Sequence, residues 1–594
     1  SSKISKDFNF LPKPDVNFSG RINNFKLSLF LKDFSKNFYF SGNIFQSLIS
    51  LPNGKVNGFS GFVKIDSDNI LLSINSNNIK ISYDSIIRED LFFDSAHGTI
   101  IIDNFKNPVL NISSLILKNQ DIDISSSGYV DTNNDILKLY SYINYVDMRY
   151  ITKYMPLRFM KNSSSKWFQK SFTNGYSKGG HILINGNLSD YPFYDGLSGI
   201  SYATFPISDL DVDYKSGWIP FNKVNGKAYF NKNSAYFISD EISVLNTKLK
   251  KSSLTIKEVR NPELKIKGTL KGPFKDLLIF SNKASLTRVS SEKIDRIKGN
   301  SETHFKMNLS FNGKKNTYES MIKLKNLEYI LDEKNRFKDL SGIINFKNDI
   351  FFTKKENIID GKYNNANIKF NLDTDKNGNF LVYGKQKISI QDYIPNKIIK
   401  ERIKGKSIWN YNIKIPGFGS TNKKIKITTN SNLSGTTIKF PKPFNKEKNH
   451  KNKLIIDTYY VDKKFTNIKI RYNKIFSEIK SLDDLTGYVN FSGKDDSMPD
   501  NKINLVGEVK YFNLAEWKNF GDDKVKINYL NFINKINLSF LNFKNGDLIL
   551  DNFLVKGFNN NKNFIFNKIV VNSDKVEIVS SGLVEYDNIT NFKI

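Results

Sequence analysis

The residue types that commonly carry catalysis are present in this chain, but they are not grouped in patterns that would make a site. The four histidines, His97, His181, His304 and His450, lie far apart, and none has the spacing of a metal motif such as HExxH. The chain has no cysteine, which excludes disulfides, thiolate metal sites and a cysteine nucleophile. We interpret the histidines as scattered surface or turn residues.

Two acidic stretches resemble sites at first sight. The segment GKDDSMPDN at 493–501 lacks the glycine and the terminal glutamate of an EF-hand loop. In DLDVDY at 209–214, Asp209, Asp211 and Asp213 alternate with apolar residues, which is the pattern of a strand with carboxylates facing solvent. The sequence contains neither a GxxxxGK[ST] nor a GxSxG motif. We therefore predict no catalytic residues, no metal site and no cofactor, and expect that the protein is not an enzyme.

The composition is that of a folded chain whose charges are spread evenly. At 594 residues it is 39% hydrophobic and 13% aromatic, which is too apolar for disorder. The formal net charge is +30, but lysines alternate with apolar residues, as in KKIKI at 423–427 and LKIKG at 264–268. This pattern is typical of a solvated strand face, and an AT-rich genome would produce the same excess of lysine. We expect no nucleic-acid partner, and attraction to an anionic membrane surface is the stronger alternative.

Alternation of apolar and polar residues with period two dominates the chain and predicts strands with one dry and one wet face. Examples are NIKFNLD with Ile368, Phe370 and Leu372, NIKIRYN with Ile468, Ile470 and Tyr472, and KINLSF with Ile536, Leu538 and Phe540. Clusters such as NGN at 185–187 and KNGN at 376–379 predict tight turns between them. The predicted fold class is all-β, with few short helices and a mostly antiparallel sheet.

A glycine followed by an alternating strand recurs along the chain, and a second form closes a strand with a Pro-Phe turn, at 186–193 and 268–280. Such repeats favour an extended architecture. At about 14 residues for each strand and turn, the chain holds roughly 40 strands. So long a sheet must twist, and few helices are available to cover its apolar face. We predict that it folds over lengthwise into a hydrophobic groove with a lysine-rich exterior.

Residues 1–594 would then form a single elongated region of repeating β units. Helical patterns predict one insert at 154–173, a second at 389–405 and a short turn at 514–520. No window approaches the ~18 consecutive apolar residues of a spanning helix. We expect any membrane anchor to lie outside this chain.

Several stretches together resemble the central region of the YhdP family of AsmA-like proteins. YITKYMPLRFM, KWFQKSFTNGYSKGGHILINGNLSDYPF and DVDYKSGWIPFNKVNGKAYF follow one another in that order. Matching positions are Tyr154, Pro156, Gly175, Gly186, Pro192, Phe193, Gly217, Trp218 and Pro220. Met155 stands where the family usually has leucine, and one residue separates Trp218 from Pro220 where the two are usually adjacent.

Three later stretches agree in the same order. GKSIWNYNIKIP (405–416) resembles the family's glycine-to-tryptophan strand, SNLSGTTIKFPKPFNK (431–446) its LPxPxxK segment, and LVGEVKYFNLAEWKNF (505–520) its LDLxxW segment. The matching residues are Leu433, Gly435, Pro441, Pro443, Lys446, Gly507, Leu514 and Trp517.

The resemblance implies a fold and a function that the composition does not show. AsmA-like proteins such as YhdP and TamB are anchored in the inner membrane of a Gram-negative envelope by an N-terminal helix. They extend through the periplasm as a folded-over β-sheet and are implicated in carrying phospholipid towards the outer membrane. By this resemblance the chain is a periplasmic middle portion without the anchor and the C-terminal end. The expected partners are phospholipid acyl chains and the inner and outer membranes, and no partner protein is indicated.

Groove-lining residues are predicted from alternation alone. The candidates are Ile182, Ile184, Leu264, Ile266, Ile368, Phe370, Ile425, Ile427, Ile468, Ile470, Ile536, Leu538 and Phe540. They would line a path for acyl chains, because removing a methylene from water is favourable by roughly 0.8 kcal/mol. The alternative is that they fill a closed sandwich core, and a register slip of one residue would reverse any single strand.

The insert at 154–173 is rich in large apolar side chains, namely Met155, Phe159, Met160, Trp167 and Phe168. These are too many for a free surface helix, so we expect it to pack against a sheet face. A sharper hypothesis is that it plugs or gates the groove. The predicted function is a non-enzymatic lipid conduit between membranes, and the alternative is a passive structural spacer of the cell envelope.

Overall fold

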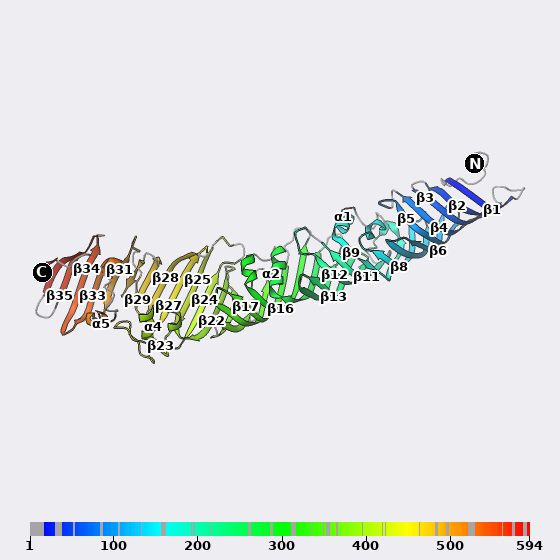
Figure 1. Cartoon of the computed structure of the whole chain (residues 1–594). Helices are drawn as coiled ribbons and strands as arrows, with labels where there is room; N and C mark the ends of the chain where they lie inside the picture. The colour runs from blue at the N-terminus through cyan, green and yellow to red at the C-terminus, as the bar shows by residue number, and fades with distance from the viewer. Residues whose placement is uncertain are drawn as a thin grey trace. The chain divides into compact units, whose positions relative to one another are not determined.

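The computed structural model describes residues 17–593, with breaks of which the longest are 30–37, 156–161, 311–316 and 521–528. The chain divides into two compact units, unit 1 (Ser1–Ile322) and unit 2 (Lys323–Ile594). Both are built almost wholly of strands (Figure 1). Among the described residues, no helix has both the length and the apolar character needed to cross a membrane.

Unit 1 holds the first sixteen strands and the start of the seventeenth. They are β1 (Asn17–Leu29), β2 (Phe38–Leu51), β3 (Gly54–Ile65), β4 (Asn69–Tyr83), β5 (Leu91–Asp103), β6 (Val109–Lys118), β7 (Ile122–Asp131), β8 (Ile136–Asp147), β9 (Phe172–Ser177), β10 (Gly180–Asn187), β11 (Gly199–Val212), β12 (Phe221–Asn231), β13 (Ser234–Val244), β14 (Thr247–Ile256), β15 (Glu263–Pro273), β16 (Ile297–Ser310) and β17 (Thr317–Ile330). Its helices are η2 (Ile151–Lys153), α1 (Asn162–Ser171), η3 (Leu188–Asp190), α2 (Phe274–Lys283) and α3 (Ser291–Asp295).

Unit 2 continues the same succession of strands. They are β18 (Arg336–Lys347), β19 (Ile350–Phe351), β20 (Ile358–Tyr363), β21 (Ala366–Thr374), β22 (Phe380–Ile388), β23 (Ile403–Gly405), β24 (Ser407–Ile415), β25 (Lys424–Ser431), β26 (Thr436–Ile438), β27 (Leu454–Val461), β28 (Lys464–Tyr472), β29 (Ile475–Ser481), β30 (Thr486–Asn490), β31 (Ile503–Val509), β32 (Phe512–Asn513), β33 (Ile533–Asn545), β34 (Leu548–Asn559), β35 (Asn563–Asn572), β36 (Glu577–Glu585) and β37 (Asn591–Lys593). Its helices are η4 (Ile390–Tyr393), α4 (Lys397–Arg402), α5 (Leu514–Lys518) and η5 (Tyr529–Phe532).

The strand pairing confirms the predicted fold class. Thirty-five strands belong to one hydrogen-bonded sheet in which sequence neighbours are mostly antiparallel partners. Parallel pairs occur where β31 follows β30 and where β33 lies beside β31 and β32. The strands β23 and β26 form a separate two-stranded sheet.

Many strands of unit 1 bend near their middle, where an extra residue interrupts the ladder. The backbone enters the left-handed region at Gln46 of β2, Gly58 of β3, Asn78 of β4, Asp209 of β11 and Lys223 of β12. The pairing register shifts beside these positions, as expected for β-bulges, which kink a strand and increase its twist. Each bend changes the direction of the strand partway along its length.

Apolar residues on both sides of such a bend join one core. In β4, Leu72 and Ile74 precede the bend while Ile79 and Ile81 follow it, and all four belong to the same hydrophobic cluster. Period-two alternation restarts after the extra residue, so both halves of the strand turn their apolar side inward. The sheet of unit 1 is therefore folded over lengthwise around its own apolar face.

At the bends of β2, β3 and β4, serine side chains make hydrogen bonds with the backbone. The Ser60 amide donates to Ser76 Oγ at 2.8 Å, and Ser76 Oγ donates to the Ser60 carbonyl at 2.8 Å. The Gln46 amide donates to Ser60 Oγ at 2.9 Å. Ser76 is fully buried, and burying a polar side chain is tolerated where it is hydrogen-bonded in this way. These hydrogen bonds connect the bends of the neighbouring strands β2, β3 and β4 to one another.

The helical segments differ from the sequence prediction. The Pro-Phe turn predicted near residue 273 is wrong, because Phe274 begins α2, whose Leu277 and Phe280 pack on the core of unit 1. Asp276 of this helix is 3% exposed and accepts a hydrogen bond from the Asn246 amide at 2.9 Å. The second insert, predicted as one helix over 389–405, is split into η4 and α4 and then continues as β23.

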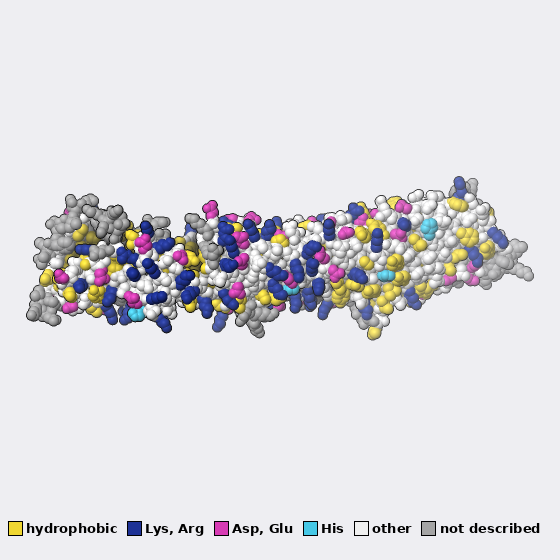
Figure 2. Space-filling view, turned by 60° about the horizontal axis from the view of Figure 1, so that its bottom comes forward, with side chains coloured by type: hydrophobic (Ala, Val, Ile, Leu, Met, Phe, Trp, Pro, Cys, Tyr) yellow, Lys and Arg dark blue, Asp and Glu magenta, His cyan; other side chains and the backbone are white. Residues whose placement is uncertain are grey.

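The exterior carries the lysines that the sequence placed on the wet faces of strands. Figure 2 shows Lys and Arg side chains scattered over the face in view, with acidic side chains among them. Individual ion pairs join neighbouring strands, such as Lys271 with Glu302 at 3.1 Å and Lys362 with Asp339 at 2.9 Å. Exposed pairs of this kind contribute at most about 1 kcal/mol each, so this surface does not hold the fold together.

Candidate functional site

The strands of unit 2 between β21 and β28 present one continuous apolar face. Backbone pairing places Ile413 opposite Ile427, and the same row passes through Thr458 to Ile468. A neighbouring row passes from Thr429 through Ile456 to Ile470. We call this surface the apolar face of unit 2; its residues are Phe370, Leu372, Val382, Ile413, Ile425, Ile427, Ile456, Ile468 and Ile470.

The side chains of this face are half-buried rather than enclosed. In the core of unit 1, by contrast, Ile143 is 2% exposed and Val146 is fully buried. A row of isoleucines that solvent still reaches is unusual, because contiguous apolar surface on a soluble protein generally marks a binding site. The apolar face of unit 2 is therefore suited to receive an apolar ligand.

The opposite face of the same strands is charged. Lys426 pairs with Asp457 at 3.2 Å, and Lys469 pairs with Glu478 at 3.0 Å. Near the ends of strands β21 and β24, Lys414 contacts Asp375 at 2.6 Å, and the hydrogen bond from this lysine holds the pKa of the Asp375 carboxyl well below its usual range. Alternation thus separates an apolar side from a solvated one across a single layer of strands.

One edge of the apolar face is covered by a segment that we call the cap, residues 432–448. Leu433 of the cap is 2% exposed and packs with Trp409 and Tyr472, which lie at the ends of β24 and β28. The Phe444 ring lies 6.3 Å from the Tyr472 ring in a stacked arrangement. Apolar rows farther from this edge remain half-buried, so the cap covers only one side of the face.

A buried lysine fastens the cap. Lys446 is 2% exposed, and its Nζ donates to the Thr436 carbonyl at 2.7 Å and to the Glu447 carbonyl at 2.9 Å. Burial lowers the pKa of this amine, because a charged group loses hydration there. The backbone of Ile438 also exchanges two hydrogen bonds of 2.9 Å with Lys446. Sequence reasoning used FPKPFNK only as a family signature and missed this role, and nothing in the local sequence distinguishes Lys446 from the exposed Lys442 four residues earlier.

The structure places the predicted groove residues in two environments. Ile184, Ile368, Ile536, Leu538 and Phe540 are buried, whereas Ile182, Leu264, Ile266, Phe370, Ile425, Ile427, Ile468 and Ile470 are half-buried. Ile536, Leu538 and Phe540 belong to a closed cluster around Phe564, which is fully buried. The contact of any of these residues with lipid stays a prediction.

The predicted gating insert is shorter than expected and begins later. In place of one helix over 154–173, the structure has η2 followed by α1, and Phe159 and Met160 lie outside the described residues. Phe168 of α1 packs edge-on against Phe172 of β9 at 5.0 Å, while Trp167 is 44% exposed. Among the described side chains of α1, none belongs to the apolar core of unit 1. Whether α1 gates a groove stays a prediction.

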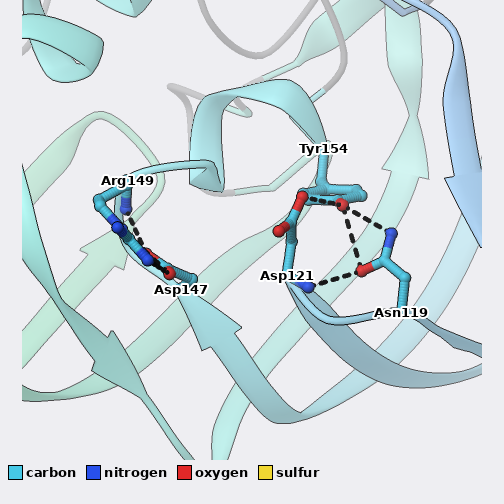
Figure 3. A network of polar contacts seen from close by, with 5 residues as sticks. All are labelled: Asn119, Asp121, Asp147, Arg149 and Tyr154. Atoms are coloured by element: carbon cyan, nitrogen blue, oxygen red, sulfur yellow. Dashed lines mark hydrogen bonds and ion pairs between the residues drawn. The ribbon is translucent and has the colours of Figure 1, made fainter.

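A polar network holds the chain that leads into α1 (Figure 3). Asn119 Nδ2 donates to the Tyr154 hydroxyl at 2.9 Å, and this hydroxyl donates to Asp121 Oδ2 at 3.1 Å. Burial raises the pKa of Tyr154. Arg88 Nη1 donates to the carbonyl of Met155, the remaining described residue of the predicted gating set. These contacts fix the turn before α1 to the neighbouring strands.

The order of the sequence motifs and this architecture agree with the comparison to known families. The chain matches the YhdP protein family over residues 11–585, which is nearly its whole length. It belongs to the YhdP family. The YhdP family is not a known enzyme family. In the described residues, no group of three or more His, Asp or Glu is placed to hold a metal ion. No curated protein and no solved structure matches the chain.

Proposed function

We propose that this YhdP-family chain is a non-enzymatic lipid-transfer protein that carries phospholipid across the periplasm from the inner to the outer membrane. The observation that carries the proposal is the half-buried apolar face of unit 2, which has a charged surface on its other side. Such transport would support the permeability barrier of the outer membrane.

The energetics favour a surface of this kind. Exposing an acyl chain of about 16 carbons to water costs about 12 kcal/mol at roughly 0.8 kcal/mol for each methylene. A row of isoleucines removes most of this cost while the headgroup stays in water. The step requires no bond to be made or broken, so catalytic side chains are not needed.

Lipid retained by the purified protein tests the proposal. Mass spectrometry of an organic extract should find phospholipid in stoichiometric amounts with the wild-type chain. A matched pair of variants identifies the surface, since Ile427→Lys should lose the lipid and Asn412→Lys should retain it. Asn412 is exposed on the charged side of β24, so both substitutions add the same charge to neighbouring strands. A wild-type chain that retains no phospholipid would contradict the proposal.

A passive spacer of the cell envelope is the second candidate, and the closed cores favour it. Val146 in unit 1 and Phe564 in unit 2 are fully buried in packed clusters. The side chains at the centre of these clusters are closed to a ligand, whereas partly buried neighbours such as Val555 border them. A spacer would tolerate Ile427→Lys with unchanged outer-membrane permeability, whereas a conduit would not.

A further inference from the structure

An aromatic bridge in unit 2 connects the cap with the closed cluster around Phe564. Phe444 of the cap meets Trp517 of α5 at a ring distance of 5.8 Å and an angle of 88°. Trp517 stacks on Phe512 of β32 at 6.1 Å, and Phe512 lies 5.3 Å from Phe540 of β33. We call the Phe444–Trp517 pair the aromatic clasp.

The apolar rows continue along the sheet from β28 through β29, β30 and β31 to β33. Backbone pairing leads from Ile470 through Ser477 to Val489, and from there through Leu505 to Ile536. Phe444 packs with the cluster on one side of the joint, and its ring also lies 6.3 Å from Phe491 on the other side. The clasp lies beside these rows at the joint, where Phe444 contacts Tyr472 and Phe491.

The clasp joins segments that are far apart in the sequence, and these segments also meet where Phe440 packs on Phe520 at 5.0 Å and Lys442 lies over the Tyr511 ring at 5.0 Å. The indole Nε1 of Trp517 donates to the Lys442 carbonyl at 3.2 Å. The Arg402 guanidinium lies over the Phe520 ring at 4.5 Å, and its Nη2 donates to the Phe520 carbonyl at 3.4 Å. Trp517 itself is only half-buried. Single aromatic, cation–π and neutral hydrogen-bonded contacts are each weak, so this closure can open while the strands beneath stay paired.

The base of the cap, by contrast, is held firmly. Lys446 and Leu433 are almost completely buried, and Thr436 is fully buried. A segment whose base is buried and whose other end is held by ring contacts has the build of a lid. We infer that the aromatic clasp is a gate on the apolar path of unit 2, which must open for an acyl chain to pass between the β21–β28 side and the β33–β35 side. The inference rests on the proposed function and adds the place where passage is controlled.

Locking the clasp in the full-length protein tests the inference. The chain has no cysteine, so Lys442→Cys with Lys518→Cys gives a unique pair that a short bis-maleimide can join. Both lysines are exposed, and they flank the hydrogen bond between residues 442 and 517. The control pair, Asn410→Cys with Asn430→Cys, lies on neighbouring strands of the charged side, where the two amides are 3.1 Å apart. Photoreactive residues at Ile427 and at Val555 report phospholipid on the two sides of the clasp.

With the clasp locked, we expect phospholipid capture to fall about tenfold at one of these two positions and to stay unchanged at the other. The control lock should change neither. Trp517→Phe keeps an aromatic ring without the Nε1 hydrogen, and it should raise capture at the position that the lock depletes. Equal capture at both positions after locking, whether unchanged or lowered, would overturn the gate. Absence of capture at both positions in the unlocked protein would instead overturn the proposed function.

Discussion

A single charge on the apolar face of unit 2 should slow phospholipid transfer strongly. Ile427 lies in the row between Ile413 and Thr458, is half-buried and points away from the charged side of β25. In Ile427→Lys the charged ammonium group stays hydrated, so the apolar surface is interrupted at strand β25. An acyl chain that passes then loses its apolar contact with one strand.

The size of the effect follows from the strand spacing. Neighbouring strands are about 4.8 Å apart, a step that about four methylenes of an extended chain cover. Leaving about four methylenes in water costs about 3.2 kcal/mol, at roughly 0.8 kcal/mol each. If this raises the highest barrier along the path, transfer slows about 200-fold, since about 1.4 kcal/mol corresponds to a factor of ten.

Transfer of labelled phospholipid from donor to acceptor vesicles measures this rate. Asn412→Lys is the matched control, because it adds the same charge to the solvated side of the adjacent strand β24 and should transfer at the wild-type rate. Circular dichroism and thermal unfolding should show both variants folded. A folded Ile427→Lys protein that transfers phospholipid as fast as wild type would refute the reasoning.

Three further predictions concern the scaffold. Phe564→Ala removes a fully buried ring and should lower the free energy of unfolding by about 3–5 kcal/mol in urea titration; an effect below about 1 kcal/mol would show that the cluster is not packed as described. Gly58→Ala should destabilise more than Gly217→Ala, because both residues have positive φ (80° and 77°) but only at Gly58 would the new Cβ meet a backbone oxygen, at 2.6 Å; equal thermal shifts would argue against the close approach at the bend. Asp375 has a lowered pKa, so its contribution to stability is present above about pH 4 and is lost as pH falls. The melting temperature of wild type should therefore fall more than that of Asp375→Asn between about pH 7 and about pH 3, and parallel curves would contradict this.

The strands and their two faces could be predicted because period two is a local signal. Ile468 and Ile470 alternate with polar residues, and the structure pairs them in the register that keeps both on the apolar side. The bends were not visible in the sequence. Asn78 and Lys223 resemble ordinary polar strand residues, and their left-handed backbone depends on partners in neighbouring strands.

The helices show where local reasoning fails. Pro273 and Phe274 have the composition of a turn, but Asp276 is drawn into a contact with the Asn246 amide, and apolar contacts of Leu277 and Phe280 stabilise α2. These partners are distant in sequence, so no window of residues reveals them.

The cap could not be predicted for a similar reason. Its sequence marked the family, but the burial of Lys446 and the contact of Phe444 with Trp517 join segments that alternation does not relate.

The degree of burial of each strand residue could not be predicted either. Ile368 and Ile427 are each flanked by polar residues, yet Ile368 is 7% exposed whereas Ile427 is half-buried. Only tertiary packing separates a closed core from an accessible face.

Photocrosslinking at each position of β25 tests the central claim most directly. A photoreactive residue placed in turn at positions 424–430 of the full-length protein in cells would sample both faces of one strand. We predict that phospholipid capture alternates with period two, high at Ile425, Ile427 and Thr429 and low at Lys424, Lys426 and Thr428. Uniform capture along the strand, or capture mainly from the lysine positions, would contradict the account.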